Sequence, residues 1–433
     1  SDGAAVLPGN PQSISDNQGD FQVTLITLAD PNHQTVEVDD LGSAVSAFTA
    51  IPVKAGVIDH FDIGINSRTN PTPADVLSDI PDHRAGSLLT HVTIIASEPF
   101  GNHVNDYTED VTLYVNHGTG ILTPTTVNLG DGLGSGTYQG SWRGPIQITR
   151  TGEDVMLFAR ENTYANTDSS NSFAVFAEAQ DYADLVVLLP GETHTPCIAP
   201  GKVGEPFSVQ AGDPVVAQII ATDAWWNQVP VQPQVHFQSD NFFQMITPND
   251  SNLDPDGTAN FDLFFKAATA HDLQVTDLIE PSHVDNSGID VTAGEFDRLM
   301  VMLPGEAAQP GGPEPDGKTG SPIPQTASLE FDVTIRAVDQ FWNQVNNSSE
   351  HVWLASDDDS LTPTNPLNTG QSLVAGELVL PTFLTSTGFV TLAGSALDNT
   401  DILGQQVAVE VQQGATYRIT TPPTALVLSL IHI

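Results

Sequence analysis

Nearly the same ten residues occur twice in this chain, 116 positions apart: residues 221–230 read ATDAWWNQVP, and residues 337–346 read AVDQFWNQVN. A third version, ASEPFGNHV, occupies residues 96–104. Each copy has an alanine, an acid two residues later, an asparagine four residues after the acid and a valine two beyond the asparagine. The spacings of 125 and 116 residues match a domain rather than a solenoid turn. The repeat therefore predicts tandem copies of one domain.

Strand-like segments keep step with this repeated turn. Segments with alternating apolar residues precede it, and a glycine-containing turn followed by a strand comes after it. The chain has 35 glycines and 31 prolines, and no segment sustains a helical period with caps, so an all-β fold is predicted. The opening strands are predicted at 58–66, 182–192 and 296–306, and the strands before the repeated turn at 85–95, 211–220 and 326–336. The glycine-containing turns with their strands are predicted at 134–142, 254–265 and 375–383.

The size of the repeat narrows the architecture. Seven or so strands in roughly 120 residues are typical of an immunoglobulin-like (Ig-like) sandwich. Cys197 is the only cysteine, which excludes an intrachain disulfide and a thiolate metal cluster. Packing between the two sheets must therefore hold each unit together.

These residues carry a family resemblance. The pattern of apolar strand, Ala-x-acid-x-x-(Gly or Trp)-Asn-x-Val and glycine-led hairpin resembles the bacterial Ig-like repeats of invasin/intimin-type adhesins and other large secreted surface proteins. The resemblance covers nearly all of residues 58–414 and implies a tandem array of Ig-like β-sandwich domains. Two features depart from the pattern: Trp226 and Trp342 stand where glycine is usual, and residues 69–83 form an insertion.

The repeat also predicts the domain organisation. Residues 16–41 resemble 254–278, so the chain is expected to begin with a partial or shortened unit, and 409–422 resemble 289–302, so a further unit is expected to start near the other end. The last six residues, LSLIHI, resemble a translated sequencing adaptor of a metagenomic assembly, with an apolar strand as the alternative. The predicted units are 1–57 (partial), 58–181, 182–294, 295–414 and 415–433 (the start of a further unit, with 428–433 as the candidate artefact).

Charge limits the partners of the chain. It carries 54 acidic and 12 basic residues, a formal net charge of −42. Such a surface repels nucleic acid and anionic lipid, so neither is predicted as a partner. Only four of the basic residues are lysines, which fits a saline or calcium-rich exterior better than a cytoplasm.

No stretch approaches the roughly 20 apolar residues that cross a bilayer, and we predict an extracellular or cell-surface protein.

The acidic residues of the turns have two interpretations. Glu98, Asp223 and Asp339 follow a strand, where a carboxylate can accept hydrogen bonds from the backbone amides two and three residues ahead. Alternatively, they join other acids in calcium sites at the domain junctions, since calcium prefers oxygen ligands. The sequence contains further acidic residues that could bind calcium, but no complete EF-hand loop. For these residues the competing interpretation is that they are solvent-exposed acids in turns. The further calcium candidates are Asp254, Asp256, Asp357, Asp358, Asp359, Asp39 and Asp40.

The aromatic residues of the turns also have two interpretations. Trp225, Trp226, Phe341 and Trp342 could stack on sugar rings and bind glycan, or they could close the end of a sandwich and pad a contact between domains. The twelve histidines lie singly, without a metal-binding spacing. No nucleophile elbow occurs, and GDGLGSG (130–136) is interpreted as a hairpin. We therefore predict no enzyme and no required cofactor, with calcium as the one candidate ion.

The leading functional hypothesis is an extracellular structural protein, in which tandem Ig-like repeats form a stalk, a filament or a surface-layer component. Short junctions such as 292–297 would stiffen the array. Its predicted partners are further repeats of the same chain or other copies of it, with strand addition at the partial units as one route. The alternatives are an adhesin that binds glycan or a surface protein, and the accessory repeats of a large secreted hydrolase.

Overall fold

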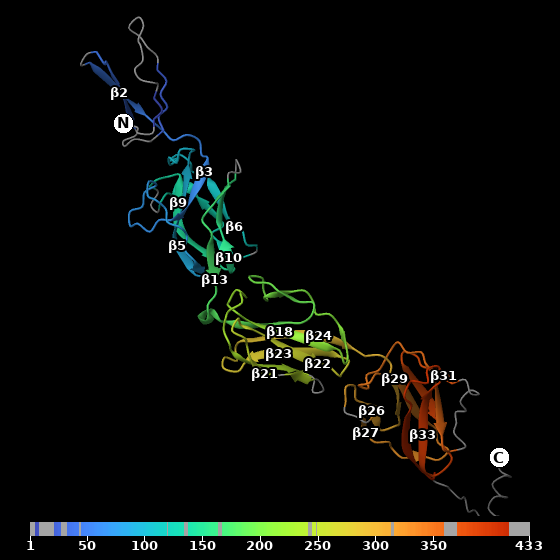
Figure 1. Ribbon diagram of the computed structural model, residues 1–433. Coiled ribbons are helices and arrows are strands. Elements are labelled where there is room, and N and C mark those ends of the chain that lie inside the picture. The colour runs from blue at the N-terminus through green and yellow to red at the C-terminus, as the bar shows by residue number, and fades with distance from the viewer. Residues whose placement is uncertain are drawn as a thin grey trace, which may run out of the picture.

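A computed structural model of the chain shows three β-domains that follow one another along the sequence (Figure 1). We refer to residues 58–181, 182–294 and 295–414 as units one, two and three. The predicted start of a further unit at 415–433, and with it LSLIHI, lies outside the described residues. The structure describes residues 5–7, 21–26, 33–42, 45–118, 120–133, 137–162, 167–240, 245–247, 249–312, 316–358 and 370–414.

Unit one has two four-stranded sheets and a smaller third sheet. The first sheet has the order β3-β5-β9-β7, the second β12-β11-β6-β8 and the third β10-β13-β4. These strands are β3 (His60–Ile65), β4 (His83–Arg84), β5 (Leu88–Ser97), β6 (Asp110–Val115), β7 (Leu122–Thr123), β8 (Thr126–Asn128), β9 (Ser141–Ile148), β10 (Gly152–Val155), β11 (Leu157–Glu161), β12 (Thr167–Ser169) and β13 (Phe173–Phe176).

Unit two has the strand order of an Ig-like sandwich. One sheet runs β14-β18-β22-β20, the other β17-β24-β23-β19-β21, and a separate ribbon pairs β15 with β16. The strands are β14 (Asp184–Leu188), β15 (Thr193–His194), β16 (Lys202–Val203), β17 (Val209–Gln210), β18 (Pro214–Thr222), β19 (Gln234–Ser239), β20 (Met245–Thr247), β21 (Asp250–Asn252), β22 (Thr258–Phe264), β23 (Ala270–Asp277) and β24 (Val284–Thr292).

Unit three repeats this plan. Its sheets run β25-β29-β32 and β28-β34-β33-β30-β31, and its ribbon pairs β26 with β27. The strands are β25 (Arg298–Met302), β26 (Glu306–Ala308), β27 (Lys318–Gly320), β28 (Gln325–Thr326), β29 (Phe331–Val338), β30 (His351–Ser356), β31 (Gln371–Ser372), β32 (Glu377–Thr382), β33 (Gly388–Ala396) and β34 (Gln405–Gln412).

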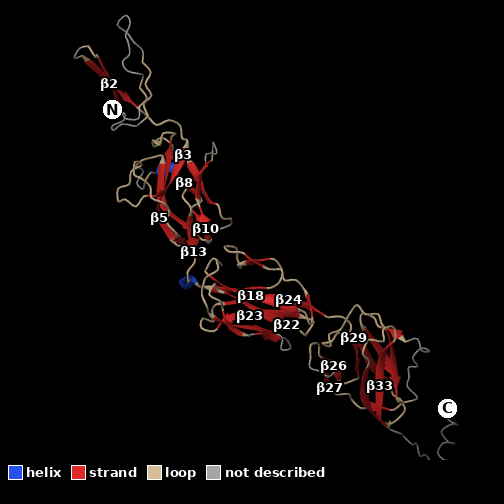
Figure 2. Cartoon of the chain, in the orientation of Figure 1, coloured by secondary structure: helices blue, strands red, loops and turns tan. Residues whose placement is uncertain are grey.

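Each unit has its own hydrophobic core, enclosed by its sheets. The cores form because alternate residues of a strand point to the same face. On β18, for example, Val215, Ala217 and Ile219 are buried, whereas Val216 and Gln218 are exposed. Among the described residues the only helical elements are the short 3₁₀ turns Leu129–Asp131 and Ala179–Asp181, seen in blue in Figure 2. The predicted all-β sandwich fold is confirmed.

The described part of residues 1–57 contains one hairpin and one isolated bridge. β1 (His33–Asp39) and β2 (Ser46–Pro52) form an antiparallel hairpin, and Val6 bridges Thr24. Of residues 16–41, which resemble 254–278, the structure describes 21–26 and 33–41. In the part of the chain that the structure describes, no helix is long and apolar enough to cross a membrane.

Candidate functional site: the junctions between the units

The repeated sequence forms the same turn in all three units, directly after β5, β18 and β29. In unit two the backbone amide of Asp223 donates to the carbonyl of Asn227 at 2.9 Å, and the amide of Trp226 donates to the carbonyl of Asp223 at 3.0 Å. The fourth residue of the turn has a positive φ, 60° at Trp226, 68° at Trp342 and 77° at Gly101. This left-handed conformation explains why glycine is usual there and means that each tryptophan is held in a strained backbone.

The acid of the turn accepts hydrogen bonds from the turn itself. Oδ1 of Asp339 accepts from the backbone amides of Phe341 and Asn343 at 2.8 and 2.9 Å. Its Oδ2 accepts from Nδ2 of Asn343 and from the amide of Gly294, both at 2.8 Å. The sequence predicted donors two and three residues ahead; the structure has them two and four ahead. The amide three residues ahead, that of Trp342, is taken by the backbone bond that closes the turn.

Asp223 and Glu98 are arranged in the same way. Asp223 accepts from the amides of Trp225 and Asn227 and from the side chain of Asn227. Glu98 accepts the corresponding bonds from Phe100 and Asn102. Burial raises the pKa of Asp223, against the opposite effect of these hydrogen-bond donors.

The asparagine of the turn reaches into the preceding unit. Nδ2 of Asn343 donates to the carbonyl of Lys266 at 2.7 Å, while its Oδ1 accepts from the amide of Ala268 at 2.8 Å. Lys266 and Ala268 directly follow β22 of unit two. The side-chain amide thus bonds the end of that strand as a neighbouring backbone would. Asn343 is 1% exposed, so the pair of bonds is shielded from water.

The same contact occurs one junction earlier. Nδ2 of Asn227 donates to the carbonyl of Thr149 at 2.7 Å, and the amide of Thr151 donates to Oδ1 of Asn227 at 3.0 Å. In the first copy, Nδ2 of Asn102 donates to the carbonyl of Ile26 at 2.6 Å. All three copies of the turn therefore tie their unit to the segment before it. We call this arrangement the asparagine clamp.

The first aromatic residue of each pair packs on the preceding unit. Phe341 contacts the core of unit two and meets the ring of Phe264 edge to face, at 5.7 Å between centroids. A Cβ added to Gly212 would lie 2.7 Å from the ring of Phe341, and one added to Gly86 would lie 1.8 Å from the ring of Trp225. The two glycines therefore provide the flat surface on which the aromatic rings of the next unit rest.

Alanine at Gly86 is expected to weaken the junction between units one and two. The methyl group would occupy the space of the Trp225 ring, and the φ of 74° adds backbone strain of about 1–2 kcal/mol. Gly101→Ala is the matched control, because its φ is 77° and nothing lies within 4 Å of the added Cβ. Tryptophan emission should shift to longer wavelength in Gly86→Ala only. An equal shift in both variants would contradict the packing of Trp225 on Gly86.

The second aromatic residue packs within its own unit. Trp226 and Trp342 lie against Gly201 and Gly317 of the ribbons β15–β16 and β26–β27. Trp342 is 4% exposed, and the guanidinium of Arg298 lies 4.8 Å from its ring centroid. This packing agrees with the interpretation that the aromatic residues close the end of a sandwich. It leaves little surface of Trp342 on which a sugar ring could stack.

The ribbons are fastened by two lysines that the sequence analysis did not single out. Nζ of Lys318 lies 2.9 Å from Glu306 and 3.1 Å from the carbonyl of Val301. In unit two Lys202 pairs with Glu192 at 3.4 Å and with Asp285 at 3.3 Å. A repeated pattern in the sequence could have pointed to these lysines. Both units contain Leu-Pro-Gly-Glu followed by Gly-Lys-x-Gly (189–192 with 201–204, and 303–306 with 317–320).

His194 gives the ribbon of unit two a further attachment. Its Nε2 lies 2.8 Å from the carbonyl oxygen of Trp226, and in the neutral tautomer with Nε2 protonated it donates to that oxygen. Burial lowers the pKa of His194, which favours this neutral form. The ribbon is thereby joined to the same turn that forms the clamp.

One stretch of unit three also matches a phosphate-binding pattern. Residues 312–319 read GPEPDGKT, which fits the G-x-x-x-x-G-K-T form of a P-loop. A P-loop needs a helix directly after the lysine, and here Lys318 begins β27 instead. The ammonium group of Lys318 is already paired with Glu306. The match therefore indicates a ribbon and not a nucleotide site.

The candidate calcium ligands do not gather in one place. Asp254 and Asp256 are exposed on a turn, where Asp256 accepts from Thr258, and Asp357 accepts from the amide of Thr391. Asp359 lies outside the described residues. No group of three or more His, Cys, Asp or Glu side chains that could hold a metal occurs among the residues described.

Calcium sites and hydrogen-bonded turns, the two interpretations of these acids, differ in the effect that a chelator should have. A calcium ion at a turn carboxylate such as Asp339 would have to replace the amide donors that now occupy both of its oxygens. We therefore expect the thermal unfolding midpoint to be the same with calcium and with a chelator. A fall in the midpoint on chelation would support a calcium site.

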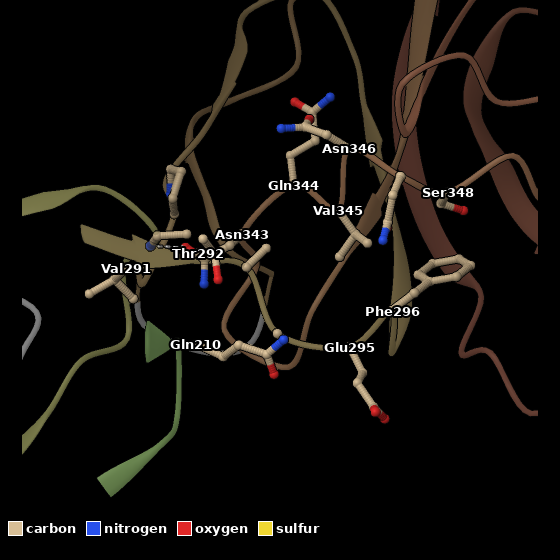
Figure 3. A pocket seen from close by; sticks show the side chains of 15 residues that line it. Gln210, Val291, Thr292, Glu295, Phe296, Asn343, Gln344, Val345, Asn346 and Ser348 are labelled. Carbon is tan, nitrogen blue, oxygen red and sulfur yellow. Dashed lines mark hydrogen bonds between the residues drawn. The ribbon is translucent and has the colours of Figure 1, made fainter. Parts of the chain in front are cut away.

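A cleft of about 800 Å³ opens beside the clamp between units two and three (Figure 3). Gln210 and Thr292 contribute from unit two, and Phe296 and Asn346 from unit three. Among the described residues that line it, Glu295 is the only one with an ionisable side chain. The cleft thus contains no pair of carboxylates, and no nucleophile beside a base, of the kind that hydrolysis needs.

No protein-family model matches the chain, and no curated protein matches its sequence. Among solved structures, the Escherichia coli adhesin FdeC is similar at 13% identity and a TM-score of 0.31, over 83% of this chain and 100% of that chain. Invasin, a bacterial integrin-binding protein, is similar at 13% identity and a TM-score of 0.24, over 76% of this chain and 57% of that chain.

Domains 1–6 of the surface layer protein SbsC are similar at 14% identity and a TM-score of 0.20, over 86% of this chain and 42% of that chain. The chain therefore spans about half the length of the invasin and SbsC chains. Its structural neighbours include bacterial Ig-like adhesins and a surface-layer protein, the class of repeat protein that its sequence pattern resembles.

Proposed function

We propose that the chain is an extracellular structural protein whose Ig-like units form a stiffened rod, as part of a stalk, a filament or a surface layer. The observation that carries this proposal is the asparagine clamp. The same side chain, Asn102, Asn227 or Asn343, bonds the segment before its unit at each of the three junctions. A junction that merely linked independent domains would have no need of a buried polar contact repeated at every step.

The clamp opposes bending for a physical reason. Opening the junction between units two and three would separate Asn343 from two backbone groups and expose the Phe341 ring to water. Exchanging a protein hydrogen bond for one to water costs about 0.5–1.5 kcal/mol net, and exposing part of an aromatic ring adds to that cost. Contacts between domains of one chain are otherwise small and permit motion. The clamp and the aromatic ring together favour one angle between neighbouring units.

The charge of the chain supports the same proposal. A net charge of −42 keeps a long chain soluble and separates neighbouring rods by mutual repulsion. Salt or divalent cations outside the cell would screen this repulsion and permit lateral packing. Two of the four lysines, Lys202 and Lys318, are used inside the units, so few remain at the surface to attract anions.

The test is the shape of the double variant Asn227→Ala, Asn343→Ala in solution. Loss of both clamps should broaden the distribution of angles between units, so small-angle X-ray scattering should give a shorter maximum dimension and a smaller radius of gyration. The control is Asn346→Ala, Asn347→Ala, because both of these asparagines are exposed. Circular dichroism checks that the units stay folded. If both double variants scatter like the parent chain, the clamps do not stiffen the rod and the proposal fails.

A further inference from the structure

The far end of unit three carries the same backbone groups that the clamps use at the other junctions. In units one and two, a carbonyl accepts from the clamp asparagine just beyond the end of a strand, and the amide two residues later donates to it. β32 of unit three occupies the place of β9 and β22 in the sandwich. The corresponding groups are Thr149 O and Thr151 N in unit one, Lys266 O and Ala268 N in unit two, and Thr385 O and Thr387 N in unit three.

A backbone hydrogen bond fixes this correspondence. In every unit, the residue before the one whose carbonyl faces the clamp also takes part in a backbone hydrogen bond. Its carbonyl oxygen accepts from the amide of a residue with positive φ. β34 also pairs in parallel with β28, as β24 does with β17. The bonds are Gly86 N to Ile148 O at 2.8 Å, Gly212 N to Phe265 O at 2.9 Å, and Ser328 N to Leu384 O at 2.8 Å.

Asp358 of the same unit holds this edge of unit three in shape. Oδ2 of Asp358, a buried carboxylate, accepts from the amides of Thr385 and Ser386 at 2.7 and 2.8 Å. Residues 385–387 are exposed, and nothing in the described part of the chain bonds the carbonyl of Thr385 or the amide of Thr387. A donor and an acceptor two residues apart are therefore presented to solvent at the positions that Asn227 and Asn343 fill elsewhere.

We propose that this edge, residues 385–387 with Ser328, is a docking surface for the acid-x-x-x-Asn turn of a further Ig-like unit joined in tandem. The inference rests on the rod proposed above. The occupant follows from the chemistry of the edge. A side-chain amide supplies both the donor and the acceptor that the edge requires, and in this chain each copy of the turn holds its amide ready with a buried acid.

Ser328 makes this docking surface different from the other two. It stands where Gly86 and Gly212 carry the aromatic ring of the next unit, and it has a positive φ of 64°. Because a Cβ at Gly212 would lie 2.7 Å from the Phe341 ring, the Cβ of Ser328 must push such a ring aside. A docked turn is therefore expected to sit less tightly here, and Ser328→Gly should tighten it.

The experiment extends the chain and measures hydrogen exchange. Residues 295–414 are added a second time after residue 414, so that Gly414 precedes Glu295 as Gly294 does in the parent. Exchange at the Thr387 amide, followed by mass spectrometry, should slow about tenfold, the effect of roughly one net hydrogen bond. Asn343→Ala in the added copy should restore fast exchange, and Asn399→Ala in that copy, at an exposed asparagine outside the turn and the cleft, should not. Ser328→Gly in the receiving unit should slow exchange further.

The amides of Thr151 and Ala268 separate the two proposals in the same measurement. If they are protected and Thr387 exchanges equally fast with and without the added unit, the docking surface is refuted while the rod survives. If all three exchange fast, the rod proposal fails as well. Sedimentation of the parent chain should show a monomer. Association of the parent chain that protects Thr387 would assign the surface to a second copy, and it would overturn the tandem occupant.

Discussion

Lys318→Met is expected to lower the free energy of unfolding of unit three by about 3–5 kcal/mol. The ammonium group of Lys318 and the carboxylate of Glu306 lie 2.9 Å apart, and their side chains are only 4% and 8% exposed. Removing the lysine leaves the carboxylate of Glu306 buried without its ion-pair partner, with only the backbone amide of Leu303 as a donor. Because Met fills a similar volume, the loss would come from the unpaired charge and not from a cavity. Denaturant unfolding of the full chain, followed by tryptophan emission, measures the change.

Two comparisons test the cause of that loss. Lys266→Ala removes an exposed lysine side chain and should change the stability by no more than about 0.5 kcal/mol. The double variant Lys318→Met, Glu306→Gln should recover most of the loss, because no unpaired charge then remains buried. If Lys318→Met alone behaves like Lys266→Ala, the ion pair does not fasten the ribbon.

Asp339→Ala is expected to destabilise unit three by at least about 3 kcal/mol, since the loss of even two of its hydrogen bonds, at about 1.5–3 kcal/mol each, reaches that value. Asp339 is fully buried and accepts four hydrogen bonds, two from turn amides, one from Asn343 and one from Gly294. The variant also frees the Asn343 side chain and should loosen the clamp. Unfolding by urea would show the loss, and exchange at the Ala268 amide would show the loosened junction.

The control for Asp339→Ala is Asp332→Ala, an exposed acid on β29 of the same unit. Asp339→Asn should fall between the two, because one oxygen still accepts from the turn while the new amide group faces donors. Equal stability of Asp339→Ala and Asp332→Ala would mean that the turn does not depend on its carboxylate. If Asp339→Ala speeds exchange at the Ala268 amide but leaves the stability unchanged, Asp339 supports the clamp and not the folding of unit three.

Several features could be predicted from the sequence because they depend on local pattern. Alternation along segments such as 211–220 predicts a strand with one buried face, and β18 has that pattern of burial. The positive φ of Trp226 and Trp342 follows from their alignment with Gly101. The cores are separate because each is closed by strands of one repeat, and packing between sheets needs no cysteine pair.

The role of the clamp asparagine could not be predicted. Its partners are backbone groups, such as the carbonyl of Lys266, which lies 77 residues earlier. Every residue has a backbone carbonyl, so the sequence contains no signal that marks this one. The two tryptophans of ATDAWWNQVP likewise look equivalent in sequence. In the fold, Trp225 faces Gly86 of the preceding unit, while Trp226 faces Gly201 of its own ribbon.

By itself the sequence determined that the chain is a tandem series of β-sandwiches with one turn repeated in each, because strand alternation and turn geometry are local properties. Only the tertiary structure decided what that turn does. Its acid is used inside the turn, its asparagine outside it, and its paired aromatics on two different surfaces. These assignments depend on which backbone edges come within hydrogen-bond distance, and that distance is set by the packing of whole units against each other.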